Sequence, residues 1–182
     1  MTPPIRDLLA SQFDIAAALL DYHLASLTTE ECLWRPAQAG LHVQRTAHGR
    51  WLADWPEHER YDLGPPSIAW TTWHILFWWS MLFDHSFGAA TLTREQVPWP
   101  GDADAVRAGV GQLQSRWRAT LAGLDDAALA ATERTRWPMT GRPFADVAAW
   151  VNIELTKNAA EIGYGRFLYA VRALACRDTF EP

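Results

Sequence analysis

Apolar residues recur at helical spacing along most of the chain. In residues 4–27 they follow the i, i+3, i+4, i+7 pattern of an amphipathic helix. Ser67 and Gly88 are residues that suit the beginning and the end of a second helix. The pattern predicts four long helices, at residues 4–27, 67–88, 102 or 104–121, and 143–174.

The segment between the first two long helices has a different pattern. Residues 41–46 and 50–55 flank Gly49, which can adopt the positive φ that a short hairpin requires. Trp51 and Trp55 have like parity here and could form a lid over one end of the helices. These features predict an all-α fold, a four-helix bundle with a small β-hairpin insertion between the first two long helices, in a single domain spanning residues 1–182.

Residues 63–83 contain no Asp, Glu, Lys or Arg and are long enough to suggest a membrane span. However, the stretch begins with Gly64-Pro65-Pro66, and its tryptophans lie along its whole length rather than at two interfacial ends. We interpret it as a buried helix and expect no membrane partner.

Composition narrows the class of protein further. The net charge is −5 and the basic residues do not cluster, which argues against a nucleic-acid partner. Cys32 and Cys176 lie far apart and no signal-peptide pattern opens the chain, so we expect a cytoplasmic protein with two packed, unreactive thiols. Eleven tryptophans are present, and core packing is the first expectation for each of them.

Polar residues on two of the predicted helices do not suit a purely structural core. Glu154, Asn158 and Glu161 lie in one narrow sector of the last helix, which they share with apolar residues. His74 lies on a packing face of the second long helix. If these helices face one another, the imidazole can approach Glu154 and Asn158 in one pocket.

Three segments, in this order and spacing, resemble motifs of the DinB-like superfamily of small bacterial four-helix-bundle proteins: residues 27–36, 67–75 and 150–168. That superfamily includes thiol-dependent S-transferases and isomerases. In its metal-binding members, three histidines hold the ion, one from the second helix and two spaced i, i+4 from the last. His74 matches the first histidine, whereas Glu154 and Asn158 stand at the other two positions.

The resemblance implies one divalent metal (Zn, Ni or Fe) held by His74, Glu154 and Asn158. It further implies transfer of a low-molecular-weight thiol to a small electrophile, with His74 and Glu154 as catalytic residues, and a homodimer that pairs through helices. A neutral amide is a weak ligand for such metals, so other interpretations stay open. His74 and Glu154 could instead form a metal-free acid–base pair or a hydrogen-bonded network, or the three side chains could fail to converge.

Lys157 and Glu161, which are near Glu154 in the sequence, allow further interpretations of the site. Lys157, the only lysine, can pair with Glu154 or with Glu161, and these residues could help to bind a ligand. A non-catalytic ligand-binding module and a structural dimer are the alternative functions. The remaining histidines are expected to be exposed or packed rather than functional: His42, His48 and His58 exposed, and His85 packed or at a rim.

Overall fold

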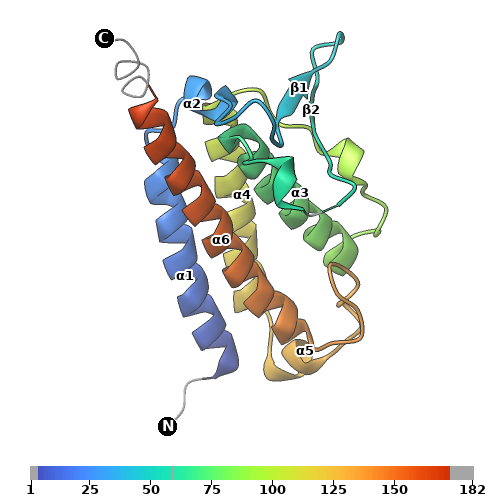
Figure 1. The fold of residues 1–182 in the computed structure, drawn as a ribbon. Helices are drawn as coiled ribbons and strands as arrows, with labels where there is room; N and C mark the ends of the chain where they lie inside the picture. Colours follow the sequence, from blue (N-terminus) through green and yellow to red (C-terminus); the bar gives the residue numbers. More distant parts are fainter. Residues whose placement is uncertain (1–3, 59, 173–182) are drawn as a thin grey trace, which may run out of the picture.

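The computed structural model describes residues 4–58 and 60–172 and is mostly helical, with a small antiparallel hairpin (Figure 1). The long helices are α1 (Ile5–Leu24), α3 (Ile68–Phe87), α4 (Ala103–Ala122) and α6 (Phe144–Val171). The shorter elements are α2 (Thr29–Leu33), β1 (Val43–Arg45), β2 (Trp51–Ala53), α5 (Asp126–Ala130), and the 3-10 turns Tyr61–Leu63 and Arg94–Gln96. The predicted helices and hairpin are therefore present, and positions 173, 174 and 176 of the predictions lie outside the described residues.

Side-chain caps explain where several helices begin. Ser67 Oγ accepts the Trp70 N–H at 3.3 Å, and Asp102 Oδ1 accepts the Ala105 N–H at 2.7 Å. Each cap satisfies a backbone donor that the first turn of a helix leaves without an intrahelical partner. In the hairpin turn, Gly49 has a φ of 79°, as its position predicts.

The four long helices pack along one another, and their chain directions include both parallel and antiparallel pairs. α1 and α6 run the same way, because α6 contacts α1 near its start through Asn152 and Leu9, and near its end through Arg166 and His23. α3 runs opposite to α6, and the end of α6 packs tightly on the start of α3 at Gly165, where a Cβ would lie 2.9 Å from Ile68. α1 and α6 lie side by side, α3 packs against α6, and α4 contacts both α1 and α3 (Figure 1).

Tryptophans fill much of the single continuous core. Five are almost completely buried: Trp73, Trp78, Trp79, Trp99 and Trp117. Trp99 also ties the hairpin to the helices, because its ring packs edge-on against Trp51 with centroids 5.3 Å apart and its indole N–H donates to Thr72 Oγ1 at 3.1 Å. Cys32 is buried as expected, and this burial raises the pKa of its thiol to about 12, which keeps it protonated.

His42 corrects one prediction, because it is buried rather than exposed. Its backbone N–H donates to Asp54 Oδ2 and its carbonyl accepts the Asp54 N–H, which anchors the base of the hairpin. This pairing places the imidazole under the hairpin, against Gly40, where neither ring nitrogen has a partner. His48 and His58 are exposed, as predicted.

The charge-free stretch of residues 63–83 forms the last 3-10 residue before α3 and most of that helix, whose side chains are largely buried in the core. Within residues 4–58 and 60–172, none of the helices has the combination of length and apolar character that a membrane crossing requires.

The Trp99–Thr72 hydrogen bond gives a stability prediction. Thr72→Val should lower the free energy of unfolding by about 1–3 kcal/mol, because it leaves the buried indole N–H of Trp99 without an acceptor. Thr71→Val is the matched control on the same helix, since the Thr71 hydroxyl contacts only the Ser67 carbonyl, which already accepts the Thr71 N–H. Urea denaturation of both variants measures the difference, and equal losses would contradict this assignment.

Candidate functional site

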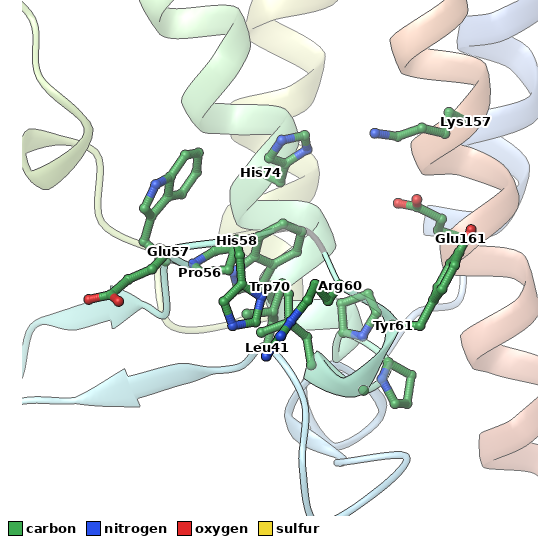
Figure 2. A pocket seen from close by; sticks show the side chains of 15 residues that line it. Leu41, Pro56, Glu57, His58, Arg60, Tyr61, Trp70, His74, Lys157 and Glu161 are labelled. Atoms are coloured by element: carbon green, nitrogen blue, oxygen red, sulfur yellow. The ribbon is translucent and has the colours of Figure 1, made fainter.

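A pocket of about 780 Å³ opens between α3, α6 and the loop that follows the hairpin (Figure 2). The loop supplies most of its rim, including Trp55, His58, Arg60 and Tyr61. The two helices supply four further side chains: Trp70 and His74 from α3, and Lys157 and Glu161 from α6. An aromatic-walled concavity with a few converging polar groups is the usual form of a small-molecule site.

Trp70 holds His74 in place within this pocket. The two rings stack nearly parallel, 9° apart with centroids 5.1 Å apart, one helical turn from each other on α3. The Trp70 indole N–H donates to the Asp54 carbonyl at 2.7 Å, so the stack is also fixed to the hairpin. The His74 side chain is 18% exposed, and its Nδ1 is buried without a hydrogen-bond partner.

Glu154 faces His74 from α6. Its Oε1 lies 3.8 Å from His74 Nδ1, which is beyond hydrogen-bond distance but close enough for a strong electrostatic interaction, and its side chain is only 13% exposed. Lys157 Nζ approaches the same oxygen at 2.5 Å and forms an ion pair one turn along the helix. Lys157 therefore pairs with Glu154 rather than with Glu161, and its amine extends from α6 toward His74 (Figure 2).

Asn158 is completely buried between α3 and α6, and both ends of its amide are used. Its Oδ1 accepts the Trp78 indole N–H at 3.0 Å, and its Nδ2 donates to Glu161 Oε2 at 3.1 Å. Asn158 thus orients the Glu161 carboxylate, which lines the pocket, while it binds the two helices together.

These surroundings keep His74 neutral. Burial, and then the Lys157 ammonium, lower the pKa of His74 from 6.5 to about 4, against the opposing effects of Glu154 and Asn158. At neutral pH the imidazole is therefore uncharged and has a ring nitrogen available to accept a hydrogen bond.

The structure brings together all five residues singled out from the sequence: His74, Glu154, Lys157, Asn158 and Glu161. His85 lies outside the pocket and its Nε2 is 3.3 Å from the Leu92 carbonyl. Sequence reasoning missed the rim residues Arg60 and Tyr61 because the loop has no periodicity. Of the two tryptophans proposed as a lid, Trp55 lines the pocket and Trp51 does not.

The residues at the implied metal position do not fit a divalent cation as they are arranged. The Lys157 ammonium occupies the Glu154 oxygen that would face the ion, and the Asn158 oxygen accepts the Trp78 N–H. A cation held by these three residues would have to compete with one positive charge and break one buried hydrogen bond, and of the three only the His74 ring has no ion-pair or hydrogen-bond partner to give up. Among the described residues, no group of three His, Cys, Asp or Glu side chains forms a metal-binding cluster.

The model of the DinB superfamily matches residues 12–162 of the chain, a segment that contains all five site residues. The chain therefore belongs to the DinB superfamily, as the order of its motifs predicts. No curated protein and no solved structure matches the chain.

The lowered pKa of His74 predicts an acid-sensitive component of stability. An unfolded chain binds a proton at His74 near pH 6.5, whereas the folded chain resists it until about pH 4, so this stability is complete above pH 6.5 and is lost as the pH falls toward 4. As the pH falls across this window, the free energy of unfolding of the wild-type protein should decrease by on the order of 2 kcal/mol more than that of the His74→Gln variant. Denaturant titrations from pH 4 to 7 measure the difference.

His85→Gln, on the same helix but outside the pocket, is the control for that experiment. It should follow the wild-type pH dependence, because His74 is intact in it. A His74→Gln profile parallel to wild type would show that the imidazole is not held neutral.

Proposed function

We propose that the protein uses a DinB-type four-helix bundle as a rigid frame for a small-molecule-binding pocket that works without a metal. The observation that carries this proposal is His74, a neutral imidazole with an unpartnered ring nitrogen, beside the Glu154–Lys157 pair in an aromatic-walled pocket. A neutral imidazole carries one N–H and one acceptor nitrogen, and because Nδ1 faces Glu154, Nε2 is the nitrogen left to contact a ligand in the pocket.

The pocket lining defines the chemical class of the ligand. Trp55, Trp70 and Tyr61 offer aromatic surface for an apolar or aromatic body. His74 and Glu161 both offer acceptors, while the positive charge of Lys157 is largely neutralised by Glu154. The ligand is therefore a compact molecule with an apolar part and at least one O–H, N–H or S–H donor.

Transfer of a low-molecular-weight thiol is the second candidate function, and the position of Glu154 favours it. In that reaction the S–H proton passes to the His74 ring, the thiolate sulfur bonds to an electrophilic carbon, and the leaving group departs with its bonding electrons and takes up the proton. Glu154, 3.8 Å from Nδ1, would stabilise the transient imidazolium. An imidazole with a pKa of about 4 is a weak base toward a thiol with a pKa of about 8.5, so binding is the first proposal and transfer the second.

Binding can be tested with a panel of small thiols (cysteine, dithiothreitol, glutathione), their S-methyl derivatives, and small aromatic amines. At least one compound with an O–H, N–H or S–H group should bind, observed by calorimetry and by the emission of Trp70 and its neighbours. His74→Leu should weaken that binding about tenfold or more, the effect of one lost hydrogen bond. His85→Leu, the matched control, should bind as wild type does.

Two results would contradict the proposal that the pocket binds a small molecule through His74. One is the absence of binding by any member of the panel, and the other is equal binding by the His74→Leu and His85→Leu variants. Nickel and zinc are added to the protein in a separate experiment. We expect neither ion to shift the melting temperature or to be retained stoichiometrically. A stoichiometric metal that His74→Leu abolishes would instead support the three-residue metal site implied by the family resemblance.

The second candidate is tested by consumption of a thiol in the presence of an electrophilic dye. A transferase should accelerate this reaction, and His74→Leu and Glu154→Gln should both reduce the rate, whereas His85→Leu should not. Binding of the S-methyl derivatives as tightly as the thiols, with no acceleration, would leave a binding protein only.

A further inference from the structure

Glu161 is a carboxylate of the pocket whose charge has no cation beside it. Its Oε2 accepts a hydrogen bond from the neutral amide of Asn158 at 3.1 Å. None of the ion pairs formed within residues 4–58 and 60–172 includes Glu161. Figure 2 shows the Glu161 side chain extending from α6 into the pocket. A negative charge is therefore held in place there by a completely buried residue, with one carboxylate oxygen left for a ligand.

The two cationic side chains that line the pocket, Lys157 and Arg60, are already paired with other carboxylates. Lys157 Nζ lies 2.5 Å from Glu154 Oε1, and Arg60 Nη2 lies 3.1 Å from Asp62 Oδ2. The His74 ring is neutral and contributes no charge. Because each cation is matched by a carboxylate of its own, the charge that is left unbalanced in the pocket is negative.

The antiparallel packing of α3 and α6 places Trp70 at the same level of the pocket as Glu161. The start of α3 packs on Gly165 of α6, whereas His74, further along α3, lies beside Glu154. Trp70 and Glu161 lie between these two contacts on their helices, and both line the pocket. A ligand group that contacts the Glu161 carboxylate is therefore next to the aromatic wall of the pocket as well.

A carboxylate beside aromatic rings has the chemistry that recognises an organic ammonium ion. The carboxylate accepts charge-assisted hydrogen bonds from the ammonium N–H groups, and the faces of tryptophan and tyrosine rings attract a positive charge. The rim already contains one contact of the second kind, since the Arg94 guanidinium lies 4.6 Å from the centroid of the Trp55 ring. A small inorganic cation is a poorer occupant, because it requires several oxygen ligands and Glu161 supplies a single carboxylate.

We propose that the ligand of this pocket is an organic ammonium ion, whose N–H groups donate to Glu161 and whose apolar part lies against the aromatic wall that includes Trp70. This inference rests on the proposed binding function and narrows its ligand class. A neutral alcohol or thiol would leave the charge of Glu161 unbalanced in a partly enclosed pocket. An anionic ligand would be repelled by Glu161 and would find Lys157 and Arg60 already paired.

Three probes that share an aromatic ring and differ in charge test the inference on the wild-type protein: benzylammonium, benzyl alcohol and phenylacetate. Calorimetry at neutral pH should give a dissociation constant for benzylammonium about tenfold or more below that for benzyl alcohol, the effect of a charge-assisted hydrogen bond. Phenylacetate should not bind. Benzylammonium binding no tighter than benzyl alcohol or phenylacetate would overturn the ammonium inference alone, whereas no binding by these probes or by the thiol panel would overturn the proposed binding function as well.

Substitution of Glu161 then locates the contact. Glu161→Gln should weaken benzylammonium binding about tenfold or more and leave benzyl alcohol binding unchanged, because glutamine keeps an acceptor for the Asn158 amide but carries no charge. Glu133→Gln is the matched control, since it removes the same charge from an exposed position outside the pocket, and it should bind benzylammonium as wild type does. Equal affinities of the two variants for benzylammonium would overturn the inference.

A measurement on the unmodified sequence covers the case in which the Glu161→Gln variant fails to fold. Benzyltrimethylammonium keeps the aromatic ring and the positive charge of benzylammonium but has no N–H group. Wild-type protein should bind it about tenfold or more weakly than benzylammonium, because the hydrogen bond to the Glu161 carboxylate is lost. Binding of the two ions with equal affinity would show that no N–H contact with Glu161 forms, and would overturn the inference.

Discussion

The hydrogen bond from the Trp78 indole to Asn158 is the interaction on which the site depends. It joins α3 to α6 in the interior, where neither group has access to water, so loss of either partner would leave the other buried and unsatisfied. Because the bond fixes how α3 lies against α6, it also sets the distance between His74 and Glu154. The second hydrogen bond of Asn158 directs Glu161 into the pocket. Packing and pocket chemistry are thus specified by the same amide.

The charges of the pocket are set by residues of the chain that lie close together, chiefly Glu154 and Lys157 of α6. A carboxylate at position 154 would be costly beside a neutral imidazole, but Lys157 compensates its charge from the next turn. The same lysine, added to burial, keeps His74 uncharged, and the lysine, the glutamate and the neutral histidine form a balanced set. Within this set the positive charge beside Glu154 is supplied by the chain itself, through Lys157.

The sequence was informative where a residue's effect is local or periodic. Helix ends followed from caps such as Ser67, and the meeting of His74 with Glu154 followed from the faces on which they lie. The choice of Lys157 for Glu154 was not predictable, because i−3 and i+4 partners are equivalent on an isolated helix and only the burial of Glu154 decides between them. The pocket rim at Arg60 and Tyr61 and the burial of His42 depend on how a loop and a hairpin dock, which no local pattern encodes.

The sequence of α6 is weakly amphipathic because apolar residues lie on more than one side of the helix. One side packs in the core through residues such as Val151 and Leu155, and a second side carries the polar residues of the pocket. The outer side is apolar again at Ile153 and Phe167, although a helix that faces only water would be polar there. Apolar side chains therefore lie on two sides of α6, buried on one and exposed on the other. Polar residues lie between these sides, and Lys157 among them contacts the pocket on one side and, on the other, a groove that residues of α1 and α6 line together.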